Sequence, residues 1–138
     1  MGGRGPIPTR EQMIPTIEGA YAARVAGDIA AMNAIWAPDA TYAMEGEAAL
    51  IARYPTGPTE ALAATQRLAD LLDADDVEVI DMIAEDDRVA VQWRARFSKG
   101  DRSQVLSLFS RWKFDEAGRV ASLHEYGDTA MIAEMIGG

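Results

Sequence analysis

Apolar and polar residues alternate along most of the second half of the chain. The alternation runs through four segments separated by short polar turns: residues 77–84, 88–98, 103–114 and 119–126. A period of two is typical of strands that bury one face, and connections this short leave no room for crossover helices. The segments therefore predict a meander of long antiparallel strands.

The first half of the chain has a helical pattern instead. A capping-box pattern at Thr9 precedes apolar residues at helical spacing, which predicts a helix over residues 9–26. Pro15 lacks a backbone N–H and would kink such a helix, so the regular helix could instead begin near this proline.

The remaining elements follow from turn residues and short periodic stretches. We expect helices over 28–37, 58–73 and 129–135, a strand over 39–44 and a loop over 45–57. Helices followed by strands predict an α+β fold, in which a curved, mostly antiparallel sheet wraps three N-terminal helices on one face. The Gly/Pro-rich residues 1–8 are expected to be a flexible leader, and residues 9–138 a single domain.

The last strand places one acidic residue on an apolar face. Alternation puts Glu125 on the same face as Leu123, and His124 on the opposite face. Enclosure should raise the pKa of this carboxyl group toward the range useful for proton transfer. Glu125 is therefore the candidate catalytic residue. The alternative is a structural glutamate that is hydrogen-bonded to Tyr42 or a Trp N–H, or solvated at the mouth of a pocket.

Composition narrows the function classes. A formal net charge of −9 opposes binding to nucleic acid or to an anionic membrane surface. With no cysteine and one histidine, Cys-based and multi-His metal sites are excluded, and we expect no metal. No apolar stretch approaches the roughly 18 residues of a membrane span. The N-terminus also lacks the apolar region of a signal peptide, so the sequence predicts a soluble cytoplasmic protein.

Four segments, in this order and spacing, carry a resemblance to a known family: residues 21–28 (YAARVAGD), 36–41 (WAPDAT), 84–93 (AEDDRVAVQW) and 118–130 (GRVASLHEYGDTA). They resemble the SnoaL-like branch of the nuclear transport factor two-like superfamily, the fold of ketosteroid isomerase and limonene epoxide hydrolase. The resemblance implies a cone-shaped fold whose open end holds a hydrophobic ligand. It implies many alternative activities, so it does not define one function.

The catalytic residues of these relatives are largely replaced in this chain. By the resemblance, the isomerase's proton-shuttling aspartate, oxyanion tyrosine and oxyanion aspartic acid fall on Met44, Ala20 and Ser110. The epoxide hydrolase's aspartate–arginine–aspartate set falls on Ala95, Trp93 and Glu125. Glu125 is the one catalytic-type position that the resemblance and the strand pattern both place inside the cone.

Face assignments define an expected pocket around Glu125. Its walls would be formed by Trp36, Tyr42, Met44, Val91, Trp93, Ala95, Leu108, Ser110, Trp112 and Leu123. The same residues could form a filled core. A pocket is favoured because Tyr42, Ser110 and Glu125 would otherwise be buried polar groups, costing roughly 1–3 kcal/mol each if unpaired. Candidate donors to a developing oxyanion are Tyr42, Ser110 and the indole N–H groups of Trp93 and Trp112.

These observations predict a protein that binds a hydrophobic small molecule and performs proton-shuttle chemistry with Glu125, without metal or organic cofactor. The reaction would be isomerisation, cyclisation or hydration of a polyketide-, terpenoid- or steroid-like substrate. The alternative is a non-catalytic module for ligand binding or dimerisation. We expect no nucleic-acid or membrane partner. The resemblance implies a homodimer, and the mixed aromatic and polar makeup of the convex sheet face places it around Arg94, Phe109, Arg111, His124 and Tyr126.

Overall fold

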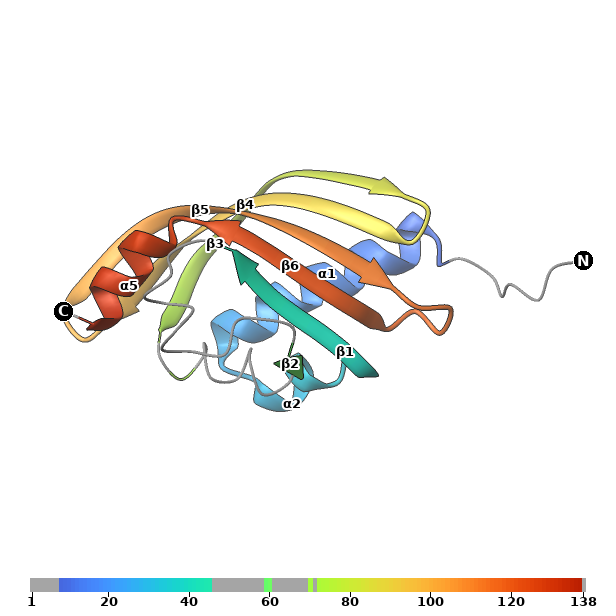
Figure 1. Ribbon diagram of the computed structural model, residues 1–138, viewed down its shortest axis with the longest axis horizontal. Coiled ribbons are helices and arrows are strands. Elements are labelled where there is room, and N and C mark those ends of the chain that lie inside the picture. The colour runs from blue at the N-terminus through green and yellow to red at the C-terminus, as the bar shows by residue number, and fades with distance from the viewer. Residues whose placement is uncertain (1–7, 46–58, 61–69, 71, 138) are drawn as a thin grey trace, which may run out of the picture.

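The computed structural model describes residues 8–45, 59–60, 70 and 72–137. Its elements, in chain order, are α1 (Arg10–Ala26), α2 (Ile29–Asn33), β1 (Trp36–Glu45), β2 (Thr59–Glu60), β3 (Asp73–Glu85), β4 (Arg88–Lys99), β5 (Arg102–Phe114), β6 (Val120–Gly127) and α5 (Thr129–Gly137). The strands form one sheet in the order β2-β1-β6-β5-β4-β3 (Figure 1). Only β1 and β6 pair in parallel within it. The predicted α+β class with a mostly antiparallel sheet is confirmed.

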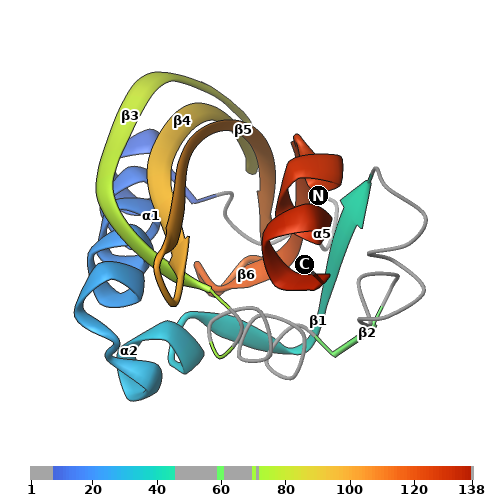
Figure 2. The same ribbon diagram turned by 90° about the vertical axis from the view of Figure 1, so that its left-hand side faces the viewer.

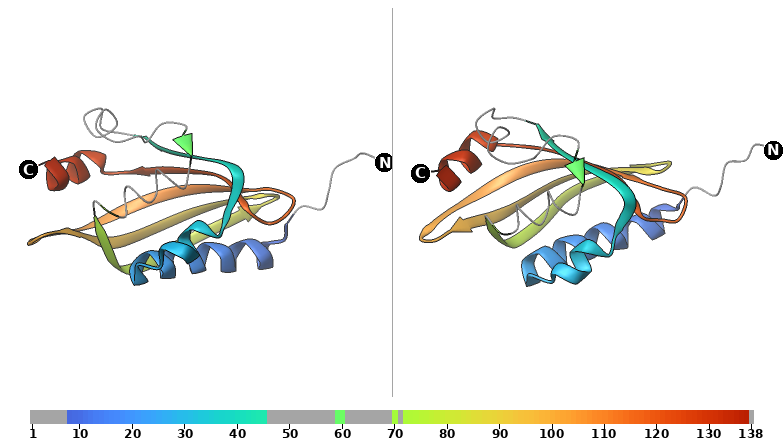
Figure 3. Two further views of the ribbon diagram at one scale, coloured as in Figure 1. Left: turned by 90° about the horizontal axis from the view of Figure 1, so that it is seen from below. Right: turned by 60° about the horizontal axis from the view of Figure 1, so that its bottom comes forward.

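The sheet is strongly curved, and β3, β4 and β5 bend around the interior of the molecule (Figure 2). Helices α1 and α2 lie along one face of this sheet (Figure 3). Alternate residues of β4 and β5 are buried on the inner face of the sheet: Val89, Val91, Trp93, Ala95 and Phe97 on β4, and Leu106, Leu108, Ser110, Trp112 and Phe114 on β5. The predicted alternation therefore sets which face of each strand meets the helices.

Helix α1 begins at Arg10 and runs through Pro15 without a break. The Thr9 backbone N–H donates to Gln12 Oε1 at 2.8 Å, as the capping-box pattern predicts. The suggestion that the helix begins near Pro15 is wrong. Pro15 is exposed close to the helix start, beside the equally exposed Glu11, so the carbonyl left without an intrahelical donor lies in the solvated first turn.

The second helix is shorter than predicted, and Trp36 belongs to a strand. Helix α2 ends at Asn33, and β1 begins at Trp36, which pairs with Val120. The ladder between β1 and β6 is irregular between Trp36 and Thr41, which is where Pro38 lies. A proline is tolerated at such an interruption because no ladder hydrogen bond is required of it. Pro38 therefore lies within the strand.

The third predicted helix, over 58–73, falls largely outside the described residues. Within that range, Thr59–Glu60 form β2 and Leu72 is buried, while Asp73 already belongs to β3. The acidic run after Leu72 is the irregular start of β3, so this strand begins earlier than the predicted residue 77. Asp76 adopts a positive φ of 50°, and the register with β4 shifts next to it.

The other predicted elements are confirmed with small changes at their ends. Three polar turns separate the strands of the meander, and Asp86, Gly100 and Gly118 adopt positive φ angles in them. Helix α5 follows Asp128, whose Oδ1 accepts a hydrogen bond from the Met131 backbone N–H at 3.0 Å. The expected leader and the 45–57 loop lie almost entirely outside the described residues. Within the described ranges, no helix has both the length and the apolar character needed to cross a bilayer.

Candidate functional site

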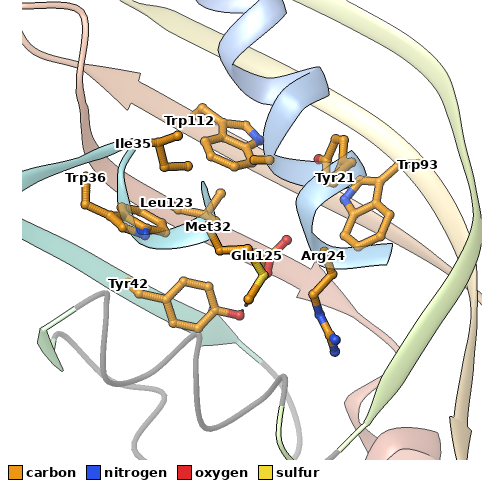
Figure 4. Close-up of a pocket in the computed structure, with 11 residues that line it drawn as sticks. Tyr21, Arg24, Met32, Ile35, Trp36, Tyr42, Trp93, Trp112, Leu123 and Glu125 are labelled. Atoms are coloured by element: carbon orange, nitrogen blue, oxygen red, sulfur yellow. Dashed lines mark hydrogen bonds between the residues drawn. The ribbon is translucent and has the colours of Figure 1, made fainter. Parts of the chain in front are cut away.

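A pocket opens between α1, the segment that joins α2 to β1, and the inner face of the sheet. Its cavity volume is about 110 Å³. The lining residues are Ala20, Tyr21, Arg24, Met32, Ile35, Trp36, Tyr42, Trp93, Trp112, Leu123 and Glu125 (Figure 4). Aromatic rings form much of the wall, and Trp36 stacks nearly parallel to Trp112 at a centroid distance of 6.4 Å. Such a wall suits a hydrophobic ring system.

The carboxylate of Glu125 lies at the centre of the polar part of the pocket. Tyr42 Oη donates to Glu125 Oε1 at 2.8 Å, and Ser110 Oγ donates to Glu125 Oε2 at 2.6 Å. Strand register produces this arrangement, because Ser110 on β5 lies directly opposite Glu125 on β6. Tyr42 comes from β1, the other neighbour of β6. The two hydrogen bonds fix the orientation of the carboxylate and leave each oxygen with further acceptor capacity.

The indole N–H of Trp93 is a third donor, and it stabilises this arrangement through Ser110. Trp93 Nε1 donates to Ser110 Oγ at 2.8 Å, so the serine hydroxyl is held while it donates to the carboxylate. Ser110 is fully buried, with an exposed fraction of 0 %. The buried hydroxyl therefore has both a donor and an acceptor, and the chain Trp93–Ser110–Glu125 needs no solvent to satisfy it.

The surroundings of Glu125 raise its pKa. Burial is the main cause, because it penalises the charged form, and the hydrogen bonds from Ser110 and Tyr42 and the charge of Arg24 oppose it. Burial and then the neighbouring Glu125 also raise the pKa of Tyr42. The tyrosine therefore stays protonated and remains a donor, while the glutamate titrates closer to neutral pH than a free side chain would.

Arg24 supplies positive charge at the same pocket. Its guanidinium Nη2 donates to the backbone carbonyl of Leu72, which anchors the side chain beside the start of β3. Burial lowers the pKa of Arg24, and the charges of Asp73 and Glu125 partly restore it. An arginine stays protonated despite such a shift, so the pocket carries one fixed positive charge and one titrating acid. Within the described ranges, no three acidic or histidine side chains gather as a metal site requires.

Arg24→Gln should raise the pKa of Glu125 further. Arg24 is one of the groups that lower this pKa, so removing its charge makes the ionised glutamate less favourable and moves its titration to higher pH. The ¹³C chemical shift of the Glu125 carboxyl carbon, followed against pH, measures the change. Arg24→Lys keeps the positive charge, so Glu125 in this variant should titrate close to its pH in the wild type. A titration unchanged in Arg24→Gln would contradict this electrostatic role.

Three buried polar atoms at the pocket have no hydrogen-bond partner within the described part of the chain. They are Tyr21 Oη, Trp36 Nε1 and Trp112 Nε1. The exposed fractions of these residues are 8 %, 8 % and 3 %, so water does not readily replace the missing partners. Tyr21 packs edge-on against Trp112, at a centroid distance of 6.0 Å. Burial and then the charge of Glu125 raise the pKa of Tyr21, while the nearby Trp112 and Ser110 side chains oppose this shift to a smaller extent, so the hydroxyl stays protonated as a donor.

The structure places the sequence-predicted site residues in two groups. Trp36, Tyr42, Trp93, Trp112, Leu123 and Glu125 line the pocket. Met44, Val91, Ala95 and Leu108 are buried core residues that are not part of the pocket lining, and Ser110 lies behind Glu125. The sequence therefore assigned more residues to the pocket than line it. Strand parity identifies the inner face of the sheet but does not show where the helices fill the space above that face.

The expected oxyanion donors are also redistributed. Tyr42 and Ser110 donate to Glu125, and Trp93 donates to Ser110, so three of the four expected donors are already engaged. Trp112 is the one that has no partner among the described residues. Sequence reasoning missed Tyr21 and Arg24 on α1. Their helical spacing relative to the buried Ile17 was the available signal, since residues three and four apart share a face.

Comparison with known proteins agrees with this architecture. The family model for the SnoaL-like domain matches residues 17–123, which stops two residues before Glu125. Among curated proteins, none matches the sequence significantly.

Three solved structures share the fold at low sequence identity. An NTF2-like protein of unknown function from Burkholderia pseudomallei is 20% identical, with a TM-score of 0.74 over 92% of this chain and 98% of its own. An LEH-like epoxide hydrolase from M. tuberculosis is 15% identical, with a TM-score of 0.68 over 94% and 92%. IdmH, a putative polyketide cyclase from Streptomyces antibioticus, is 21% identical, with a TM-score of 0.65 over 90% and 97%. Since the matched domain spans most of the chain and the fold agrees, this protein belongs to the SnoaL-like domain family and has the nuclear transport factor two-like fold.

Proposed function

We propose that the pocket binds a hydrophobic small molecule and that Glu125 transfers protons on it as a general acid/base, in a cofactor-free isomerisation, cyclisation or hydration. The observation that carries this proposal is the Glu125 carboxylate. It lies in an aromatic-walled pocket with both oxygens oriented by hydrogen bonds and with a raised pKa. A carboxyl group whose pKa moves toward neutral pH serves both as base and as acid. Such perturbed acids in pockets are enriched at functional sites.

The donors around Glu125 suit proton abstraction next to a carbonyl group. Glu125 removes a proton from the carbon beside the carbonyl, and the electrons of that C–H bond move to the carbonyl oxygen. The resulting enolate oxygen is stabilised by Tyr21 Oη and Trp112 Nε1, whose donors have no other partner within the described ranges. Return of the proton to another carbon gives isomerisation, and attack of the enolate carbon on a second carbonyl gives cyclisation.

The names of proteins with a similar fold point to chemistry on small molecules and do not define the substrate. The proteins of similar fold include one named as an epoxide hydrolase and one named as a putative polyketide cyclase. The aromatic wall and the few polar groups of this pocket would accept a mainly apolar molecule that carries oxygen atoms.

Exchange of the C2 protons of 1-tetralone in D₂O tests the proposal without knowledge of the natural substrate. This bicyclic ketone offers an apolar ring, one carbonyl oxygen and acidic C2 protons. The protein at catalytic concentration should accelerate their replacement by deuterium, measured by ¹H NMR, beyond the rate in buffer. A protein that binds 1-tetralone saturably but leaves the exchange rate unchanged would contradict the catalytic part of the proposal.

A non-catalytic ligand-binding module is the second candidate. The observation that favours it is the completeness of the network, since Tyr42, Ser110 and Trp93 satisfy one another and Glu125 without any ligand. A purely structural glutamate would be held in the same way. The exchange assay separates the two candidates, because a binding module binds the ketone without moving its protons.

We also propose that two copies of the chain associate through the convex face of the sheet. Phe109 and Tyr126 pair across β5 and β6 there, with exposed fractions of 47 % and 39 %. His124 stacks on Tyr126 at a centroid distance of 5.6 Å. An exposed aromatic cluster of this kind, beside Arg111, which pairs with His124 across the two strands, has the composition of an interface.

Phe109→Glu should convert such a dimer into a monomer. The change places a charge at the centre of the apolar contact, and sedimentation velocity at micromolar concentration measures the result. Val25→Glu alters an equally exposed apolar residue on α1, away from this face, and should leave the dimer intact. A wild-type chain that sediments as a monomer would contradict the proposed interface.

A further inference from the structure

The three pocket donors that have no partner among the described residues point in two directions. In Figure 4 the hydroxyl of Tyr21 and the indole nitrogen of Trp112 face each other, whereas the indole nitrogen of Trp36 faces the side where Tyr42 lies. The rings of Trp36 and Trp112 are nearly parallel, with an interplanar angle of 15°. One ligand oxygen placed between Tyr21 and Trp112 would therefore leave Trp36 Nε1 without an acceptor.

We propose that Trp36 Nε1 forms a second acceptor-binding subsite, and that the ligand is a ring system with two separate acceptor oxygens. One oxygen binds between Tyr21 and Trp112, and the other binds Trp36. This inference deepens the proposed function and rests on it. It concerns which oxygens the ligand carries, and it is independent of whether Glu125 moves a proton.

The balance of donors and acceptors carries the inference. Trp36 is more than nine-tenths buried, and its N–H has no acceptor among the described residues. A buried donor left without a partner costs roughly 1–3 kcal/mol, so a ligand that supplies an acceptor recovers part of that cost. Tyr42 lies on the same side of the pocket and already donates its hydroxyl hydrogen to Glu125. It therefore does not compete with the Trp36 N–H for a ligand oxygen.

None of the described lining residues near Trp36 accepts a hydrogen bond from its N–H. Met32, Ile35 and Leu123 are apolar lining residues, and the Glu125 carboxylate is held toward Tyr42 and Ser110, which donate to it. A hydrocarbon would fill the space but leave the Trp36 N–H unsatisfied. A ligand oxygen is therefore the group that this corner selects, because it satisfies the donor and fits between apolar side chains.

Three probes of similar size separate the contributions: naphthalene with no oxygen, 1-tetralone with one carbonyl, and 1,4-naphthoquinone with two. The chain has no cysteine, so thiol addition to the quinone does not compete with binding. The three tryptophans give three indole N–H signals in a ¹H–¹⁵N spectrum of the full chain. Trp93 is an internal reference, because its N–H is already bonded to Ser110.

The expected result is stepwise. Naphthalene shifts the indole signals by ring currents without slowing their hydrogen exchange. 1-Tetralone slows exchange at Trp112, and 1,4-naphthoquinone slows it at both Trp112 and Trp36, while Trp93 stays unchanged. If 1,4-naphthoquinone binds but the Trp36 N–H exchanges as fast as with naphthalene, the proposed Trp36 subsite is overturned, while ligand binding in the pocket is still supported. If none of the three probes binds saturably, the proposed function itself fails.

Trp36→Phe provides the matched variant, because it keeps an aromatic ring and removes the N–H. The ratio of naphthoquinone affinity to naphthalene affinity should fall about threefold to tenfold, as expected for one lost hydrogen bond. Using the ratio cancels apolar contacts that both probes lose with the smaller ring. A ratio equal to that of the wild type would overturn the proposal. If the variant fails to fold, the exchange pattern of the wild-type indoles decides the question alone.

Discussion

Glu125→Gln is expected to slow the exchange of the 1-tetralone C2 protons by about a hundred- to ten-thousand-fold, because general acid–base catalysis typically contributes that much. The amide keeps the volume of the side chain, and its oxygen still accepts a hydrogen bond from Tyr42 or Ser110. It cannot take up the C2 proton. The fold should therefore remain intact, and the affinity for 1-tetralone should change far less than the rate.

Glu18→Gln is the matched control, since the same substitution is made at an exposed residue of α1. Its exchange rate should equal that of the wild type. The rate of the wild type should also rise with pH through the pKa of Glu125, which lies above that of a free glutamate, because the ionised form is the base. An exchange rate that survives Glu125→Gln would remove the catalytic assignment, and any remaining ligand binding would favour the non-catalytic module.

Tyr21→Phe is expected to have the second largest effect, slowing the same exchange by about a hundredfold, as removal of one oxyanion donor does in other enzymes. The ring remains to pack against Trp93, at a centroid distance of 4.7 Å, and against Trp112. Only the hydroxyl that receives the enolate charge is lost. The loss should therefore appear in kcat more than in KM, because the neutral ketone needs this donor less than the enolate does.

Tyr126→Phe makes the same change on the convex face, where the hydroxyl cannot reach the pocket, and should leave the exchange rate unaltered. Trp112→Phe tests the other donor of the pair and should also lower kcat. Equal losses of binding and rate in Tyr21→Phe would assign the hydroxyl to ligand binding alone. An unaltered rate would show that the enolate oxygen lies elsewhere in the pocket.

The polar groups of the pocket divide into two sets with different tasks. Tyr42 and Ser110 donate hydrogen bonds to Glu125, and Trp93 donates one to Ser110, so substitution of any of the three should alter the orientation and pKa of Glu125. Tyr21, Trp36 and Trp112 have no such engagement within the described ranges and remain open to a ligand. This division makes separate predictions for residues that sit within the same small cavity.

The amino-acid sequence alone was sufficient for much of the sheet. Period-two alternation determined that Glu125, Ser110 and Trp93 share the inner face, because successive side chains of a strand must point to opposite sides. The turn residues determined where the meander reverses. Local patterns also determined the capped start of α1, since the capping bond joins residues three apart.

Tertiary structure alone decided which groups meet at the site. Arg24 and Tyr21 lie about a hundred positions from Glu125 in sequence, and only the packing of α1 against the sheet brings them to the pocket. The pairing of Trp36 with Val120 across β1 and β6 decided that this residue begins a strand, although the local pattern is helical. Tertiary structure also decided which donors are engaged and which are open. Periodicity assigns a side chain to a face, but the partner it finds there depends on segments distant in the chain.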